Sequence, residues 1–182
     1  MKTKYFTICV FLFILVMKLS IGIVSGSIFE FKAKNIDGSE VALNNFKGKV
    51  LLVVNTASRC GFTPQYKSLE KIYKKYKERD FIVLAFPSND FRQELSTNEE
   101  IREFCEVYEL SFPIFAKGKV KGFDKQHIFK YLTEDSNGKN MGEIRWNFEK
   151  FLVGRDGKLF KRYRSSVDPN RDEIRKAIES LL

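Results

Sequence analysis

Short segments of alternating or continuous apolar residues follow one another along most of the chain. Between residues 29 and 43, apolar and polar positions alternate on either side of an Asp-Gly pair, which predicts a β-hairpin. Residues 50–55 and 81–86 are almost continuous apolar runs that contain β-branched residues. Runs of this kind are typical of strands buried on both faces of a sheet.

Helical periodicity occupies the segment between these two runs and several later segments. Between residues 66 and 76, apolar residues recur three and four positions apart, which predicts a helix with one buried face. Overlapping capping-box patterns at 96–100 predict the start of a second helix, and Cys105 falls on its apolar face. The later elements that we expect are a strand at 112–115, a helix at 124–132, a hairpin at 148–163 and a final helix capped by Asp168-Pro169.

This order of elements predicts a single α/β domain over residues 27–182, with a central mixed β-sheet flanked by helices. A helix joins the two buried strands, so we expect them to pair in parallel. A chain of 182 residues is long enough for one hydrophobic core.

Residues 1–26 differ from the rest of the chain. Two lysines precede a twelve-residue apolar run at 6–17, and small residues follow it. The run has the length of the apolar part of a signal peptide and is short for a membrane span. We expect a signal peptide cleaved between residues 22 and 27, and a protein of the secretory pathway: in the endoplasmic reticulum lumen, secreted, or in an organelle reached through that pathway. The alternative is an uncleaved membrane anchor formed by residues 6–24.

Charge and cysteine content exclude several classes of protein. The net charge of +9 favours solubility, and no basic run is interleaved with aromatic residues as in nucleic-acid-binding modules. Two cysteines and one histidine outside the first 26 residues make a structural zinc site improbable. The chain after residue 26 is long and apolar enough to fold without disulfides. We therefore expect any functional importance of Cys60 and Cys105 to lie in their reactivity.

Cys60 follows the strand predicted at 50–55 and precedes a helix. Free backbone N–H groups, the positive end of a helix and the adjacent Arg59 all favour a thiolate at this place. The position predicts a nucleophilic cysteine, and the alternative is an inert, buried one.

Four segments, NTASRCGFTPQY, LAFPSNDFRQE, FPIF and WNFEKFLV, occur in this order. Together they resemble the glutathione peroxidase family, and the resemblance extends from residue 29 to 182. It implies a thioredoxin fold, hydroperoxide substrates and Cys60 as the peroxidatic cysteine, with no metal or organic cofactor. It also implies that Gln93, Trp146 and Asn147 surround the sulfur. Amide and indole N–H groups there would favour the thiolate and orient the peroxide.

The resemblance further implies that Cys105 is a resolving cysteine, as in members of the family that use thioredoxin. The Cys60 sulfenic acid would then condense with Cys105 to a disulfide, which thioredoxin or a protein disulfide isomerase would reduce. A core-facing Cys105 reaches Cys60 only if its helix unwinds locally. If Cys105 is inert, the expected reductant is glutathione.

The sequence departs from the family pattern after the second buried strand, where FPSNDFRQEL stands in place of FPCNQFGGQEP. Ser88 replaces a cysteine found in many members, and the segment is one residue shorter, which can shift Gln93. Asn89 has either a helper role or only that of a turn-former.

The segment between Phe115 and Trp146 is short, as in monomeric members whose open site accepts lipid hydroperoxides. A basic cluster could contact phosphate head groups at a membrane surface, or it could be ordinary solvated charge. Its members are Lys117, Lys119, Lys121, Arg145, Arg155 and Arg162.

Other functions fit the sequence less well. A redox relay would use the same cysteines to pass disulfides to partner proteins. A catalytically inactive scaffold would require the set of Cys60, Trp146 and Asn147 to be coincidental. A Cys-His hydrolase would need an oriented histidine, and the sole candidate, His127, is expected on a helix surface.

Overall fold

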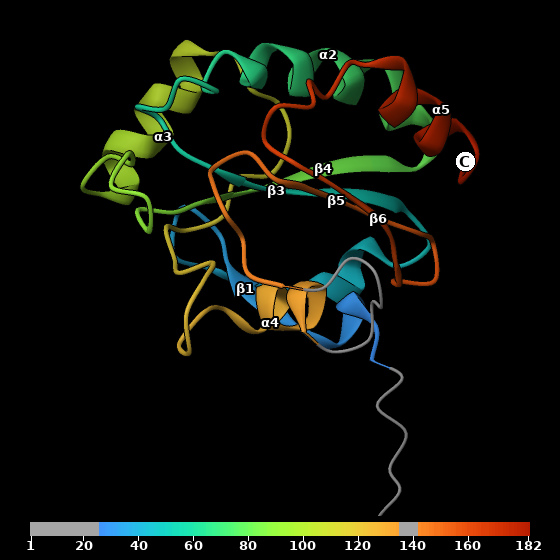
Figure 1. The fold of residues 1–182 in the computed structure, drawn as a ribbon, viewed down its shortest axis with the longest axis horizontal. Helices are drawn as coiled ribbons and strands as arrows, with labels where there is room; N and C mark the ends of the chain where they lie inside the picture. The colour runs from blue at the N-terminus through green and yellow to red at the C-terminus, as the bar shows by residue number, and fades with distance from the viewer. Residues whose placement is uncertain (1–25, 135–141) are drawn as a thin grey trace, which may run out of the picture.

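A mixed β-sheet forms the centre of the protein, as the computed structural model shows for residues 26–134 and 142–182 (Figure 1). Within these ranges the main sheet has the strand order β4-β3-β5-β6, and a separate hairpin pairs β1 with β2. β3 and β4 are parallel, whereas β5 is antiparallel to both of its neighbours, so the predicted mixed sheet is confirmed. The strands are β1 (Lys32–Lys34), β2 (Glu40–Ala42), β3 (Val50–Thr56), β4 (Phe81–Pro87), β5 (Lys150–Val153) and β6 (Leu159–Tyr163).

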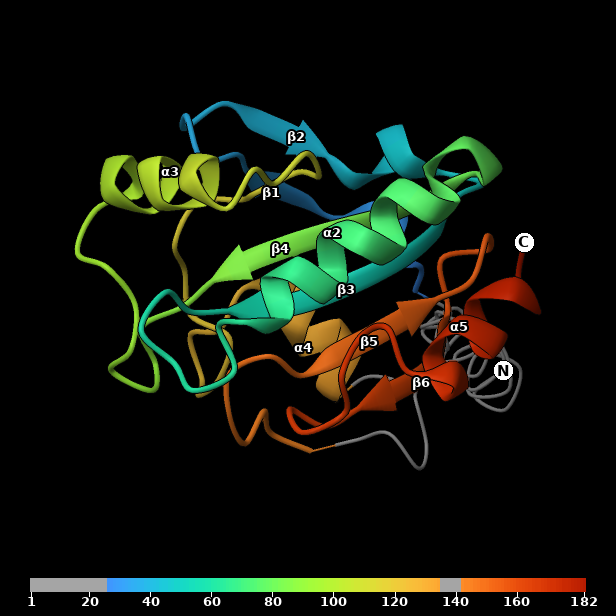
Figure 2. The ribbon, with the colours of Figure 1, turned by 90° about the horizontal axis from the view of Figure 1, so that it is seen from above.

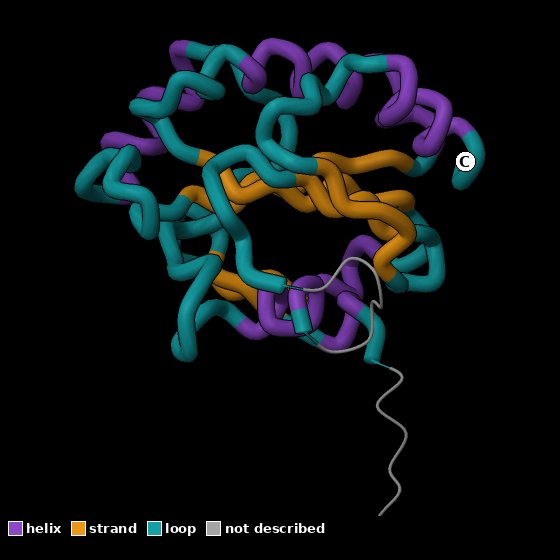
Figure 3. The backbone as a smooth tube through the Cα atoms, in the orientation of Figure 1, coloured by secondary structure: helices purple, strands orange, loops and turns teal. Residues whose placement is uncertain are grey.

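Helices cover both faces of this sheet (Figure 3). In Figure 1, α2, α3 and α5 lie above the sheet, and α4 lies below it beside β1. The α-helices of the described residues are α2 (Gln65–Tyr76), α3 (Asn98–Val107), α4 (His127–Thr133) and α5 (Asp172–Glu179). Short 3-10 helices occur at Ile28–Glu30, Leu43–Phe46 and Lys77–Arg79.

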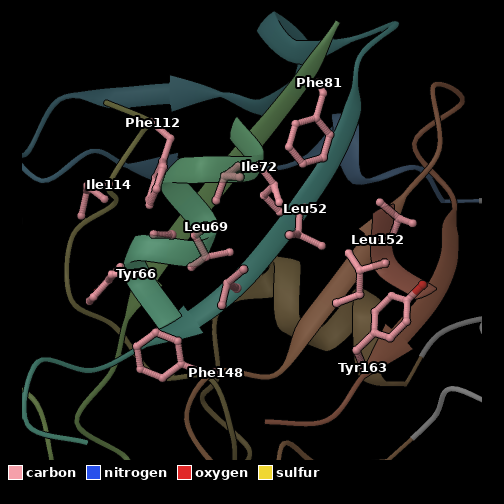
Figure 4. Close-up of a cluster of buried hydrophobic side chains, with 14 of the residues drawn as sticks. Leu52, Tyr66, Leu69, Ile72, Phe81, Phe112, Ile114, Phe148, Leu152 and Tyr163 are labelled. Atoms are coloured by element: carbon pink, nitrogen blue, oxygen red, sulfur yellow. The ribbon is translucent and has the colours of Figure 1, made fainter. Parts of the chain in front are cut away.

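Two apolar clusters, one on each side of the sheet, form the core. Every residue of β3 is buried, and successive side chains alternate between the clusters, as the pleat of a strand requires. On the upper side, Leu69 and Ile72 of α2 and Leu52 of β3 belong to one cluster, and Tyr66 packs edge-on against Phe148 (Figure 4). Burial of each aliphatic side chain stabilises the fold by about 1.5–3 kcal/mol, so packing holds α2 against β3.

The segment at 112–115 is not a regular strand, contrary to our prediction. It makes isolated bridges, in which Ile114 pairs with Ala85 and Phe115 pairs with Asn35. Pro113 accepts a hydrogen bond from Ala85 but has no N–H to donate, so a continuous ladder cannot form there.

The final helix begins later than the sequence predicted. α5 starts at Asp172, and Arg171 is its N-cap. Asp168 instead accepts hydrogen bonds from the Asn170 backbone N–H and the Ser68 hydroxyl. Its carboxylate therefore closes a turn that connects to α2, and the helix forms after that turn.

The predicted signal peptide or anchor at 1–26 lies, except for Gly26, outside the described residues and stays a prediction. In the described parts of the chain, no helix has the length and hydrophobicity needed to cross a membrane.

Candidate active site

Three chain segments meet at one end of the central sheet (Figure 2). β3 and β4 are parallel and end together, since Thr56 pairs with Pro87. β5 runs the opposite way, and its first residue, Lys150, pairs with Val54. The loops after β3 and β4 and the segment before β5 therefore share this end, and they carry the predicted residues Cys60, Gln93, Trp146 and Asn147.

Cys60 lies in a short loop that is closed by hydrogen bonds. Thr63 Oγ1 accepts the Cys60 backbone N–H at 2.9 Å and donates to the Ala57 carbonyl at 2.9 Å. Cys60 is 7% exposed, and its sulfur accepts the backbone N–H of Phe62 at 3.4 Å. The loop between strand and helix therefore directs a backbone donor at the sulfur.

Gln93 and Asn147 contact each other across this end of the sheet. Asn147 is fully buried, and its Nδ2 donates to Gln93 Oε1 at 2.9 Å. The Gln93 carbonyl accepts the backbone N–H of Arg59 at 2.8 Å, one residue before Cys60. The two predicted amides are thus joined to each other and, through the main chain, to the Cys60 loop.

Trp146 lies at the rim of the site. Its side chain is 42% exposed, and its ring packs on that of Phe91 with 5.2 Å between centroids. Among residues 26–134 and 142–182, no direct hydrogen bond joins the Cys60 sulfur to Gln93, Trp146 or Asn147. The structure therefore places these residues at the same end of the sheet, with Gln93 and Asn147 in direct contact and with no hydrogen bond from any of these three described side chains to the sulfur.

Cys105 is buried on α3, as its place on the apolar face predicted. It is 5% exposed and is a free thiol, as is Cys60. Burial, followed by the negative charges of Glu94 and Glu106, raises the pKa of Cys105 to about 12. Both cysteines belong to the apolar cluster above the sheet.

Comparison with known proteins identifies the family. A sequence model described as glutathione peroxidase matches residues 28–133. A glutathione peroxidase homolog, BsaA, of Halalkalibacterium halodurans is 49% identical over 86% of this chain and 99% of its own. The hydroperoxy fatty acid reductase gpx1 of Synechocystis is 48% identical over 87% of this chain and 97% of its own. The chain belongs to the glutathione peroxidase family. It is a thiol peroxidase that reduces hydroperoxides, as the resemblance implied.

Solved structures agree with this assignment. The apo crystal structure of Trgpx matches with a TM-score of 0.69 and 39% identity, over 86% of this chain and 96% of that one. A thiol:disulfide interchange protein DsbE of Chlorobium tepidum matches with a TM-score of 0.60 and 17% identity, over 83% and 92% of the two chains. The second likeness concerns the fold alone, and it confirms the thioredoxin fold of this peroxidase.

The shortened loop of this glutathione peroxidase keeps Gln93 in the site. Arg92 adopts a left-handed backbone, with φ of 57°, where the family pattern has glycines. Asn89 fixes the turn, because its carbonyl accepts the Arg92 N–H at 2.9 Å and its Oδ1 accepts the Glu94 N–H at 3.1 Å. Asn89 therefore shapes the loop, and this turn holds Gln93 opposite Asn147.

Glu94 is a buried acid of the site that the sequence analysis missed. Its Oε1 accepts the backbone N–H groups of Ser58 at 3.0 Å and Leu95 at 2.8 Å. Burial is the main cause that raises the pKa of Glu94 above its usual range. Its position next to Gln93 was the one signal available in the sequence. The carboxylate ties the Cys60 loop to the segment that leads into α3.

The six basic residues predicted to flank the site do not form one patch. Arg155 binds the carbonyls of Gly48 and the C-terminal residues, at the opposite end of the sheet, so this part of the prediction was wrong. Arg162 is buried in an ion pair with Glu149, and Lys119 pairs with Asp124. Lys117 donates to the carbonyls of Leu95 and Ser96. Lys121, whose Nζ lies 4.5 Å from the centroid of the Phe91 ring, and the exposed Arg145 are the two that stand near Trp146.

A metal site needs several ligating side chains close together. No group of three or more histidine, cysteine, aspartate or glutamate side chains in the described residues is arranged to hold a metal ion.

Proposed function

We propose that Cys60 is the peroxidatic cysteine and that Gln93, Asn147 and Trp146 supply hydrogen-bond donors to the reacting peroxide. The observation that carries this proposal is the hydrogen bond between Asn147 and Gln93, together with the main-chain bond from Arg59 to Gln93. Gln93 Oε1 accepts the hydrogen bond from Asn147, and the NH2 group supplies the donors of the Gln93 side chain.

In the proposed reaction the Cys60 thiolate attacks one oxygen of the O–O bond. The S–O bond forms while the O–O bond breaks, and the departing alkoxide or hydroxide takes up the proton that the Cys60 thiol lost on forming the thiolate, which gives an alcohol or water. Cys60 is oxidised to a sulfenic acid and the peroxide is reduced. Donors placed around the site stabilise the negative charge that develops on the leaving oxygen.

Cys105 is the proposed resolving cysteine. Its sulfur attacks the sulfenic sulfur of Cys60, an S–S bond replaces the S–O bond, and the hydroxide leaves as water with the thiol proton of Cys105. Because Cys105 is buried on α3, this step requires local opening of that helix. A thioredoxin-like or disulfide-isomerase-like dithiol then reduces the disulfide, and glutathione is the alternative reductant. The cycle needs no metal or organic cofactor.

The rim of the site suits organic and lipid hydroperoxides as well as hydrogen peroxide. Trp146 and Phe91 offer an apolar edge, and the Lys121 ammonium lies beside it. This pair of features fits an acyl chain with an anionic head group, and one relative is named as a hydroperoxy fatty acid reductase. We further propose a monomer without nucleic-acid partners, with residues 27–182 as one domain in a secretory-type compartment.

The test of the proposed function is peroxide consumption coupled to reduced thioredoxin or to glutathione. Cys60→Ser is expected to abolish turnover with hydrogen peroxide and with a fatty acid hydroperoxide. Cys105→Ser is expected to keep the first oxidation of Cys60 but to lose turnover with thioredoxin. Turnover by Cys60→Ser would contradict the role of Cys60, and normal thioredoxin-supported turnover by Cys105→Ser would remove Cys105 from the cycle.

A further inference from the structure

We infer that Asn55 is a positioning residue for the peroxidase reaction, because it holds the segment that carries Trp146 and Asn147 against the end of β3. The inference rests on the proposed roles of those two side chains. It concerns a residue that contacts neither peroxide nor sulfur and acts through the main chain of its neighbours.

Three hydrogen bonds connect Asn55 to this segment. Asn55 Nδ2 donates to the Trp146 carbonyl at 3.1 Å, and Oδ1 accepts the Glu149 N–H at 2.9 Å. The Asn55 carbonyl accepts the Phe148 N–H at 2.6 Å. The Trp146 carbonyl and the Phe148 N–H belong to the peptide groups before and after Asn147. Asn55 therefore fixes the main chain on both sides of that residue.

The chemistry of an asparagine suits this place. The β3–β5 ladder ends where Val54 pairs with Lys150, and Phe148 then turns the chain with a left-handed φ of 61°. A regular ladder cannot continue through that turn, which leaves a carbonyl and an N–H to be satisfied. An amide side chain presents one donor group and one acceptor, whereas a carboxylate or an aliphatic side chain lacks the donor. Asn55 is fully buried, so water does not replace the lost bonds.

The left-handed conformation of Phe148 shows that the segment is held against its own preference. This conformation is unfavourable for a residue with a side chain and persists where the surroundings fix it. The Phe148 ring is buried and meets the Tyr66 ring edge-on at 5.3 Å between centroids. Packing and the Asn55 hydrogen bonds together maintain the turn.

Glu149 supports the same segment from its other end. Its buried carboxylate accepts the Arg145 backbone N–H at 2.7 Å and pairs with Arg162 at 2.8 Å and Arg164 at 2.9 Å. The ends of the segment are thus anchored by Glu149, and its middle, which carries the proposed catalytic donors, is anchored by Asn55.

The experiment compares Asn55→Asp with the wild-type protein. The carboxylate keeps an acceptor for Glu149 but loses the donor to Trp146. Stopped-flow mixing with hydrogen peroxide measures the rate constant for Cys60 oxidation, and Trp146, the only tryptophan, reports its own surroundings by fluorescence. We expect the rate constant to fall roughly tenfold to a hundredfold, the range expected for a misplacement of about 1 Å, together with a shifted Trp146 emission maximum.

A variant with a cavity at the opposite end of the same strand is the matched control. Val50→Ala removes buried volume from the first residue of β3 and is expected to lower the midpoint of denaturant unfolding, with rate constant and emission unchanged. If Asn55→Asp does not fold, Asn55→Ser, which keeps the main-chain bond to Phe148, takes its place with the same expectation. A folded variant with wild-type rate constant and wild-type emission would overturn the inference.

Variants of the segment itself separate this inference from the proposed function. Trp146→Phe and Asn147→Ala are expected to slow Cys60 oxidation in a protein that keeps Asn55. If they slow it and the Asn55 variants do not, the inference alone is wrong. If they leave it unchanged, the proposed roles of Trp146 and Asn147 are wrong as well.

Discussion

Cys60 and Cys105 are almost equally buried, yet their surroundings differ. Cys60 lies in a loop, and its sulfur accepts a backbone N–H from Phe62. Cys105 lies on the apolar face of α3, where burial and the carboxylate of Glu94 favour the neutral thiol. Exposure of 7% against 5% does not separate the two cysteines. Their local surroundings do, because a backbone donor faces the Cys60 sulfur, whereas burial and nearby carboxylates disfavour the Cys105 thiolate. This difference supports the proposed nucleophilic role of Cys60.

The sharpest test of this contrast is the rate of alkylation. With a pKa of about 12, Cys105 is a thiolate in about one molecule in 10⁴ at pH 8. Iodoacetamide is therefore expected to modify Cys105 on the order of a thousandfold more slowly than an ordinary exposed thiol, and to modify Cys60 first. Mass spectrometry of the reduced protein over time measures both rates, and faster labelling of Cys105 would reverse the contrast.

A second prediction concerns pH and Lys150, a buried residue at the same end of the sheet as the Cys60 loop. Lys150 Nζ donates to the Ser165 carbonyl, which also accepts from Gln65 at the start of α2. Burial lowers the pKa of Lys150 to about 7 from an ordinary 10.5. The native state thus binds fewer protons than the unfolded chain between these values, so the free energy of unfolding rises with pH across that window.

Lys150→Met is expected to remove this contribution. Between pH 7 and pH 9, denaturant titrations should show a free energy of unfolding that rises by about 2 kcal/mol less in the variant than in the wild type. Lys161→Met, on the exposed side of β6, is the control and should keep the wild-type dependence. Parallel pH curves for Lys150→Met and the wild type would contradict the assigned pKa.

A smaller effect is expected when the charge beside Cys105 is removed. Glu94→Gln keeps an oxygen for the Ser58 N–H but loses the negative charge that raises the Cys105 pKa. Alkylation of Cys105 at pH 9 is expected to accelerate about threefold to tenfold, while the Cys60 rate stays the same.

The matched control for this change is Glu106→Gln. Glu106 also raises the pKa of Cys105, but its exposed side chain is screened by solvent, so a smaller acceleration is expected. Equal Cys105 rates in Glu94→Gln and the wild type would show that burial alone sets the reactivity of Cys105.

Apolar periodicity predicted the elements on either side of Cys60 and the helix that carries Cys105. Continuous apolar runs predicted β3 and β4, and an apolar stripe with helical spacing predicted α2. The capping box at Thr97 predicted the start of α3. These signals are local, so a single sequence reveals them. The prediction of a strand at 112–115 was wrong, because Pro113 lacks the N–H that a continuous ladder would need there.

The assembly of the site was less predictable. Cys60, Gln93 and Asn147 could be named from the family resemblance, but the bond between Gln93 and Asn147 joins residues far apart in the chain. The left-handed turns at Arg92 and Phe148 occur at residues that rarely adopt them. Asn55 gave no signal, and Glu94 gave only its position next to Gln93, because their contacts form only when three loops meet at one end of the sheet.

The most direct measurement is an intact mass and peptide map of the reduced protein after one equivalent of hydrogen peroxide. The account predicts a disulfide between Cys60 and Cys105 as the main product. Cys60 oxidised alone, with Cys105 still a free thiol, would contradict the two-cysteine cycle. An unreacted Cys60 would contradict the assignment of Cys60 as the peroxidatic cysteine.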